Sequence, residues 1–222
     1  MGTVDGPGLR AVVFTSGCPL RCACCHNPDT HVMTDGELTE ASLIVKKILR
    51  LKPYIKDGGV TFSGGEPCVQ ARFISEIVKE LKKEDLHIAL DTSGAVMNSD
   101  VRHLLNLVDL VLLDIKFTNE DDYFRYTGGH LADPLAMLSE CDKLGIPVWI
   151  RHVVIPNIND TEGDVRALAD LCRPYDCITK IELLPFKKLC LEKYEALGID
   201  FPLKSTPEMS GEKITYLESF LK

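Results

Sequence analysis

Several features that mark other classes of protein are missing from this chain of 222 residues. No apolar run approaches the roughly 18 residues that a membrane-spanning helix needs, and no apolar leader opens the chain, so we expect a cytoplasmic protein with no membrane partner. Acidic residues outnumber basic ones by 33 to 25, which gives a net charge of −8. Because nucleic-acid binding relies on a surplus of lysine and arginine, this charge argues against a nucleic-acid partner.

Internal repeats, low-complexity tracts and linkers rich in proline, glycine or serine are also missing. The length lies near the upper end of what one domain usually spans. We therefore expect residues 1–222 to form a single domain, and we expect the protein to be a monomer.

Strand-like runs alternate with helical patterns along the chain. Six apolar runs rich in β-branched residues predict strands at Ala11–Ser16, Gly59–Phe62, His87–Asp91, Leu110–Ile115, Val148–Ile155 and Ile178–Leu184. Helical spacing of apolar residues predicts helices around Ala41–Leu51, Phe73–Leu81, Leu135–Cys141, Val165–Ala169 and Ile214–Leu221. This alternation predicts an α/β fold with parallel strands. Six strands are two short of a closed eight-stranded barrel, so we expect an open, partial (β/α)6 TIM-like barrel.

Two of these helices carry signals for their ends. Asp133 as N-cap, Pro134 at the first position and Gly145 as the stop would frame the third helix. Thr161 and Asp164 are spaced as a capping box before the fourth.

The nine cysteines fall into two groups. Five are scattered, and we expect them to be small buried hydrophobic residues: Cys68, Cys141, Cys172, Cys177 and Cys190. The other four lie within CPLRCACC, where Cys18, Cys22 and Cys25 form a C-x3-C-x2-C pattern. Three thiolates on a short loop can hold three irons of a [4Fe–4S] cluster and leave the fourth iron open to a small molecule. A structural zinc site is the alternative, although it needs four closed ligands.

Polar or glycine-rich segments stand at the carboxyl ends of the predicted strands, where active sites of (β/α) barrels lie. The cysteine cluster follows the first strand, and the others carry Ser63–Pro67, Asp91–Gly94, Asp114–Lys116, Arg151 and Pro185–Lys187. We expect these segments to converge on one site.

Several of these residues suit a charged ligand. Gly64 and Gly65 allow close backbone approach, and the Glu66 carboxylate suits an ammonium group, although the stretch could be a simple turn. Asp114 and Lys116 lie two apart on a strand and share one face. Buried there, they need compensation by a ligand or by each other.

Seven blocks of the sequence resemble the radical S-adenosylmethionine (radical SAM) superfamily and, within it, the glycyl-radical-enzyme activases. The blocks are GTVDGPGLR, CHNPDT, SGGEP, LDTSG, LLDIK, WIRHVVIP and IELLPF, and they run from Gly2 to about Phe186. Only 37 residues without a cysteine separate Cys25 from Ser63, which favours the single-cluster type that serves pyruvate formate-lyase.

The resemblance implies a reductive cleavage of S-adenosylmethionine (SAM) at a reduced [4Fe–4S] cluster. The 5′-deoxyadenosyl radical so formed would abstract a hydrogen from the α-carbon of a glycine in a partner glycyl radical enzyme, with a flavodoxin or ferredoxin-type protein as reductant. Alternatives are an activase of another glycyl radical enzyme, such as anaerobic ribonucleotide reductase or a dehydratase, and a non-catalytic metal-cluster binding module.

The resemblance also assigns roles to residues. Cys18, Cys22 and Cys25 would bind the cluster, and Asp5 would lie near the entering glycine loop. Contacts with SAM would come from Cys24, His26, Gly64, Gly65, Glu66, Asp114, Ile115, Lys116, Arg151 and Lys187. Asp91 and Thr92, with Asp114, resemble a monovalent-cation site of the activases, although Asp91 could instead cap the next helix.

Three departures from the family pattern stand out. Cys24 occupies a position that is usually aromatic and lies against the adenine, and Lys187 replaces a histidine. The chain also begins directly at MGTVDG, where relatives have a short extra strand or loop, so we expect a short N-terminal segment to be lacking.

Overall fold

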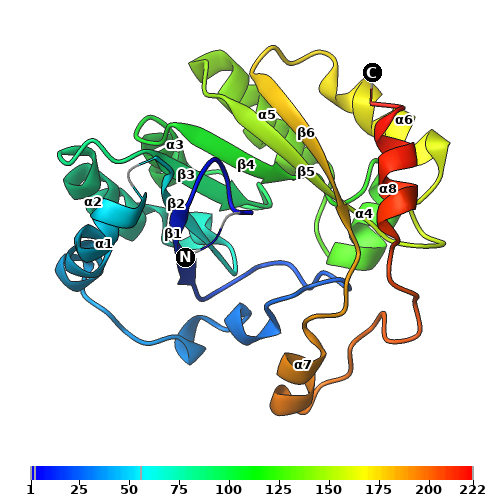
Figure 1. Ribbon diagram of the computed structural model, residues 1–222, viewed down its shortest axis with the longest axis horizontal. Helices are drawn as coiled ribbons and strands as arrows, with labels where there is room; N and C mark the ends of the chain where they lie inside the picture. The colour runs from blue at the N-terminus through cyan, green and yellow to red at the C-terminus, as the bar shows by residue number, and fades with distance from the viewer. Residues whose placement is uncertain (1, 3, 56, 222) are drawn as a thin grey trace.

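The computed structural model describes residues 2, 4–55 and 57–221 (Figure 1). Six parallel strands form one sheet in the order of the sequence, β1-β2-β3-β4-β5-β6. They are β1 (Arg10–Thr15), β2 (Gly59–Gly64), β3 (Ile88–Thr92), β4 (Leu110–Asp114), β5 (Val148–Val154) and β6 (Ile178–Pro185). Every predicted strand is confirmed to within two residues at either end. Because β1 and β6 are the two edges of this sheet, the barrel is open, as predicted.

The helices are α1 (Ala41–Ile55), α2 (Ala71–Lys82), α3 (Ser99–Leu105), α4 (Glu120–Thr127), α5 (Ala132–Leu144), α6 (Glu162–Cys172), α7 (Leu191–Leu197) and α8 (Gly211–Glu218). Short 3-10 turns lie at η1 (Pro28–Thr30), η2 (Met33–Asp35) and η3 (Pro67–Gln70). Helices α1 to α6 lie between consecutive strands of the sequence, whereas α7 and α8 follow β6, and α7 lies apart from the sheet against η1 (Figure 1). The five predicted helices are α1, α2, α5, α6 and α8, and the last one ends three residues earlier than Leu221.

The helix ends follow the predicted chemistry in two cases of four. Thr161 and Asp164 form the predicted capping box of α6, and Gly145 ends α5 with a left-handed φ of 66°. The predictions that Asp133 is the N-cap of α5 and that Pro134 is its first residue are both wrong, because the N-cap is Leu131 and the helix begins at Ala132. The backbone N–H of Asp133 is bonded to the carbonyl of His130 at 3.1 Å.

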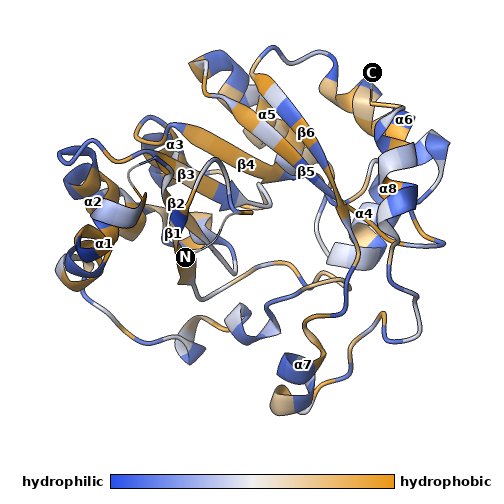
Figure 2. Ribbon diagram, viewed as in Figure 1, coloured by the Kyte–Doolittle hydropathy of each residue, from blue (hydrophilic) through white to orange (hydrophobic). Residues whose placement is uncertain are grey.

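The apolar residues divide between the two faces of the sheet. Most pack between strands and helices into one large core, and Figure 2 shows the corresponding hydrophobic strands. A smaller cluster of Ala89, Leu110 and Leu112, with Trp149 against it, lies apart from that core. The scattered cysteines are all buried, as predicted. Within the described ranges, no helix is long and apolar enough to cross a lipid bilayer.

Arg10 fixes the loop before β1 at the amino end of the sheet. Its side chain is fully buried, and it donates to Thr61 Oγ1 at 2.6 Å, to Gly58 O at 2.6 Å and to Val60 O at 2.7 Å. Burial lowers the pKa of the guanidinium to about 10. Because Thr61 Oγ1 donates in turn to Asp5 O at 2.6 Å, the same network holds the loop that carries Asp5.

The glycines after β2 let this strand end pack directly against the end of β1. Gly65 N donates to Thr15 O, and Glu66 N donates to Gly17 O, both at 2.8 Å. A Cβ on Gly65 would lie 2.5 Å from Gly17 O and 2.7 Å from Thr30 O. These distances are too short for any side chain, so the packing of backbone on backbone itself requires glycine at this position.

We predict that Gly65→Ala lowers the free energy of unfolding by about 2 kcal/mol, because the added methyl collides with rigid backbone. Gly163→Ala in the first turn of α6 is the control, since its Cβ would meet only Thr161 Oγ1, at 3.6 Å. Urea denaturation of both variants measures the difference. Equal stability of the two variants would contradict the packing argument.

Candidate functional site

The six predicted segments follow the carboxyl ends of six parallel strands and therefore lie at the same end of the sheet. The cysteine loop follows β1 and is held by backbone hydrogen bonds to two other parts of the chain. These bonds are Gly17 N to Thr30 O at 2.8 Å, Cys18 N to His31 O at 3.1 Å, Arg21 N to Thr127 O at 2.8 Å and Ala23 N to Tyr126 O at 2.7 Å. The loop is therefore clamped at its start by the residues around η1 and in its middle by the end of α4.

The four thiols of this loop are partly buried and close to one lysine. Burial raises the pKa of each thiol, to about 11 for Cys24, and the Lys116 ammonium opposes the rise in every case. Cys24 also packs against the core. Deprotonated thiolates, which are the form that binds metal, would thus be stabilised by Lys116.

The donor set of the loop fits an iron–sulfur cluster. Among the residues that the structure describes, no three histidine, cysteine or acidic side chains converge as ligands of a single metal ion would. A [4Fe–4S] cluster does not need such convergence, because each thiolate binds a different iron. Cys25 Sγ already accepts a hydrogen bond from Asn27 N at 3.4 Å.

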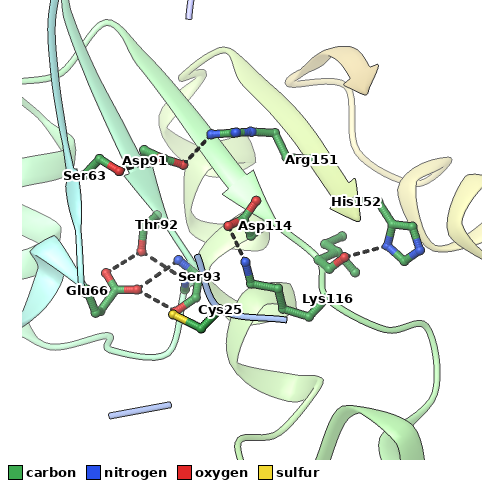
Figure 3. A network of polar contacts seen from close by, with 12 residues as sticks. Cys25, Ser63, Glu66, Asp91, Thr92, Ser93, Asp114, Lys116, Arg151 and His152 are labelled. Atoms are coloured by element: carbon green, nitrogen blue, oxygen red, sulfur yellow. Dashed lines mark hydrogen bonds and ion pairs between the residues drawn. The ribbon is translucent and has the colours of Figure 1, made fainter. Parts of the chain in front are cut away.

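Glu66 forms the centre of a buried network between β2 and β3 (Figure 3). Its side chain has no exposed surface. Oε1 accepts from Thr92 Oγ1 at 2.6 Å and from Cys68 N at 3.0 Å, and Oε2 accepts from Ser93 Oγ at 2.5 Å and Ser93 N at 2.9 Å. The expectation that this carboxylate is available to an ammonium group is therefore wrong, because all its acceptor positions are used within the protein. The stretch is also more than a turn, since Glu66 caps η3.

Two ion pairs lie beside this network. Arg151 Nη1 is 3.1 Å from Asp91 Oδ1, with side chains only 15% and 12% exposed, and Lys116 Nζ is 2.5 Å from Asp114 Oδ2. Asp114 and Arg151 are also register partners across β4 and β5. The sequence left open whether a ligand or the pair itself compensates the charges of Asp114 and Lys116. In the structure the two side chains compensate each other.

Asp91 and Asp114 differ in their protonation equilibria. Burial raises the pKa of Asp91 above its usual value despite the nearby Arg151. Burial also acts on Asp114, but Lys116 and Arg151 outweigh it and hold its pKa below the usual value. The pKa of Lys116 is raised although burial opposes the charge, because Asp114 attracts it. Asp114 and Lys116 therefore carry opposite charges at neutral pH.

The alternative that Asp91 caps the next helix is wrong. The N-cap of α3 is Asn98, whose side chain accepts from Val101 N, while the second oxygen of Asp91 accepts from Ser63 Oγ at 2.7 Å. The predicted cation ligands thus already have protein partners, since the hydroxyl of Thr92 belongs to the Glu66 network. A cation at this place would have to compete with Arg151 and Lys116 for the two carboxylates.

The structure leaves two buried polar side-chain atoms without a hydrogen-bond partner among the described residues: Arg151 Nε and Tyr123 Oη. A buried donor without a partner is costly, so each is suited to receive a ligand group. Arg151 is one of the residues that the sequence assigned to the site. Tyr123 on α4 gave no signal in the sequence, because α4 was not predicted.

The remaining predicted residues surround this centre. His26 Nε2 is 2.8 Å from Lys187 O, which joins the cysteine loop to the segment after β6, and Lys187 Nζ turns to Glu208 at 3.3 Å. Ile115 is buried, and its carbonyl accepts from His152 Nδ1 at 2.7 Å. Tyr194 of α7, which the sequence did not single out, donates from Oη to Cys25 O at 3.2 Å.

We predict that Glu66→Gln destabilises the protein without cofactor by about 2–3 kcal/mol, since an amide would place its own N–H groups against donors that need a charged acceptor. Glu195→Gln on exposed α7 is the control and should leave the stability unchanged. Urea denaturation of the cofactor-free proteins compares them. Wild-type stability of Glu66→Gln would show that this carboxylate is free for a ligand after all.

Comparisons with known proteins agree with this geometry. The family described as a 4Fe-4S single cluster domain matches residues 4–127. The pyruvate formate-lyase-activating enzyme of Clostridium pasteurianum is 43% identical over 100% of this chain and 94% of its own length. The enzyme of the same name from Staphylococcus epidermidis is 40% identical over 96% of this chain and 89% of its own length.

Solved structures share the fold at low sequence identity. A domain of pyruvate-formate lyase-activating enzyme from Bacteroides vulgatus has a TM-score of 0.61 at 22% identity, over 74% of this chain and 92% of its own. A radical SAM methyltransferase from Sphaerobacter thermophilus has a TM-score of 0.67 at 19% identity, over 96% of this chain and 63% of its own. Streptococcus suis SuiB bound to S-adenosylmethionine has a TM-score of 0.67 at 16% identity, over 81% of this chain and 41% of its own. The fold is thus that of radical SAM proteins, and the full-length relatives show that the chain belongs to the family of pyruvate formate-lyase-activating enzymes.

Proposed function

We propose that this protein is a radical SAM activase that introduces a glycyl radical into a partner enzyme, most directly pyruvate formate-lyase. The observation that carries the proposal is the clamped C-x3-C-x2-C loop at the carboxyl edge of an open (β/α)6 barrel, in a chain that matches activating enzymes over its whole length. Cys18, Cys22 and Cys25 would hold a [4Fe–4S] cluster. A reduced cluster held there would supply the electron for the cleavage of SAM to methionine and the 5′-deoxyadenosyl radical, which would take a hydrogen atom from the partner's glycine.

The residues beside the loop support binding of a charged cofactor. Lys116 holds a positive charge near Cys22 and Cys24 and would balance the charge of the thiolates. Arg151 has a buried Nε that lacks a partner in the described part of the chain and can donate to a carboxylate such as that of the SAM methionyl group. Gly64 and Gly65 would offer backbone groups to the ligand, because the Glu66 side chain is fully engaged elsewhere.

The periphery of the site would complete the binding surface. His26 and Lys187 would line it from the cysteine loop and from the segment after β6, with Ile115 contributing through its backbone. Cys24 would take the place of an aromatic residue beside the adenine. Asp5 would contact the entering glycine loop, since the Arg10 network holds only its backbone and its carboxylate attracts Arg151 of the site.

Further parts of the proposal concern the protein's surroundings. The reaction would proceed under anaerobic conditions in the cytoplasm, with a monomeric, single-domain activase and a flavodoxin or ferredoxin-type electron donor. The acidic net charge supports the absence of a nucleic-acid partner. A monovalent cation at Asp91, Thr92 and Asp114 stays part of the proposal, with rearrangement of the two ion pairs as its requirement.

Anaerobic reconstitution with iron and sulfide tests the proposal directly. The reduced protein should release methionine and 5′-deoxyadenosine from SAM, and addition of pyruvate formate-lyase should produce the EPR doublet of a glycyl radical. A loaded cluster that leaves SAM intact would contradict the proposed activity. SAM cleavage with no radical on pyruvate formate-lyase, but with one on another glycyl radical enzyme, would reassign the partner.

The four cysteines of the loop should respond differently to substitution. Alanine at Cys18, Cys22 or Cys25 removes a ligand, so iron content and SAM cleavage should both be lost. Cys24→Ala is the matched control and should retain the iron, and Cys24→Tyr should also retain it and bind SAM more tightly by offering a ring to the adenine. Iron analysis and SAM titration give the result. Loss of the cluster in Cys24→Ala with retention in Cys25→Ala would contradict the ligand assignment.

A further inference from the structure

His31 is joined to both ends of the cysteine loop. Its backbone carbonyl accepts from Cys18 N at 3.1 Å, and its ring Nε2 lies 3.3 Å from Cys25 Sγ. Its own backbone N–H is bonded to Pro28 O at 3.2 Å, at the end of η1. The side chain is half-buried, so this arrangement does not depend on a freely moving surface residue. One residue thus spans the first and the last cysteine of the C-x3-C-x2-C pattern.

The contact with Cys25 has a defined direction once Cys25 is a cluster ligand. A ligating cysteine is a thiolate, which has no hydrogen and can only accept. The ring nitrogen that faces it must therefore carry the hydrogen, which makes the Nε2–H tautomer of His31 the donor. Together with Asn27 N at 3.4 Å, Cys25 Sγ would then accept two hydrogen bonds.

We propose that His31 is a positioning residue that donates a hydrogen bond to the Cys25 thiolate and thereby raises the reduction potential of the cluster. Hydrogen bonds to the sulfurs of an iron–sulfur cluster stabilise the added negative charge of the reduced form, which shifts its potential upward. Among the described residues, Cys25 is the predicted ligand whose sulfur has a side-chain donor within hydrogen-bond distance. This inference rests on the proposed function, because it requires that the loop holds a cluster.

The hydrogen bond from His31 acts on Cys25 alone among the three predicted ligands. The Lys116 charge acts on every thiol of the loop, whereas the hydrogen bond from His31 reaches Cys25. Removal of His31 would leave the Asn27 N–H on Cys25 and all three thiolates in place. The cluster should therefore still assemble in a variant without the imidazole, and the change should appear in its potential.

The test compares three variants after anaerobic reconstitution, without SAM. His31→Phe keeps a planar ring but has no donor, His31→Gln keeps an N–H donor of similar reach, and His103→Phe changes an exposed histidine on α3 as the control. Potentials come from redox titration followed by EPR of the reduced cluster, with iron content measured in parallel. In His31→Phe the ratio of reduced to oxidised cluster at a fixed solution potential should fall about tenfold, which is 59 mV for one electron. His31→Gln and His103→Phe should match the wild type.

Each outcome decides the matter. An unchanged potential in fully loaded His31→Phe, or an equal shift in His31→Gln, overturns the inference. Should His31→Phe hold no iron, His31→Gln decides. A His31→Gln variant that holds the cluster at the wild-type potential still supports the hydrogen bond to Cys25, and a His31→Gln variant without a cluster refutes the proposal. Failure of the wild type itself to take up a cluster would instead refute the proposed function, and the inference would fall with it.

Discussion

The buried carboxylate of Glu66 is the interaction on which the carboxyl edge of the sheet depends. Its side chain gathers donors from η3 and from the end of β3, and its backbone N–H is bonded to Gly17 at the start of the cysteine loop. Burial of a carboxylate without partners would lower the free energy of unfolding by about 5 kcal/mol. The hydrogen bonds from Thr92 and Ser93 therefore offset the cost of burying this carboxylate. The position of the first cysteine is fixed by a residue that does not itself need to touch a ligand.

Above this network, two positive and two negative side chains lie close together. Asp91 pairs with Arg151, and Asp114 pairs with Lys116, while Arg151 also lies opposite Asp114 in the strand register. These four side chains together are thus neutral within a chain of net charge −8. A zwitterionic ligand can enter such a centre by exchanging partners with these side chains, so its own charges are compensated without leaving any protein charge unpaired. Among the described residues, Arg151 Nε has no hydrogen-bond partner, so it is available to donate to a carboxylate of such a ligand.

The sequence predicted what depends on local pattern. Strand periodicity, the Thr161–Asp164 capping box and the placement of polar segments at strand ends were all confirmed, because each is determined by neighbours in the chain. The directions in which side chains point were harder to predict from the sequence. Glu66 turns inward to donors 26 and 27 residues away, and His31 reaches a sulfur that its spacing from Cys25 does not single out. Such contacts depend on how loops fold over a sheet, which no periodicity encodes. The N-cap prediction for Asp133 was wrong for a smaller reason. Its backbone N–H is bonded to the carbonyl of His130, and α5 begins one residue earlier, at Ala132.

The contact of Tyr194 with the cysteine loop has a consequence for biosynthesis. Its hydroxyl covers the backbone of Cys25 from a position 169 residues later in the chain. At a synthesis rate of roughly 5–20 residues per second, the loop leaves the ribosome about 10–30 s before this cover exists. The anchoring carbonyls of Tyr126 and Thr127 also arrive well after the thiols. During that interval the fold does not cover the nascent cysteines, so their survival as free thiols depends on the reducing power of their surroundings.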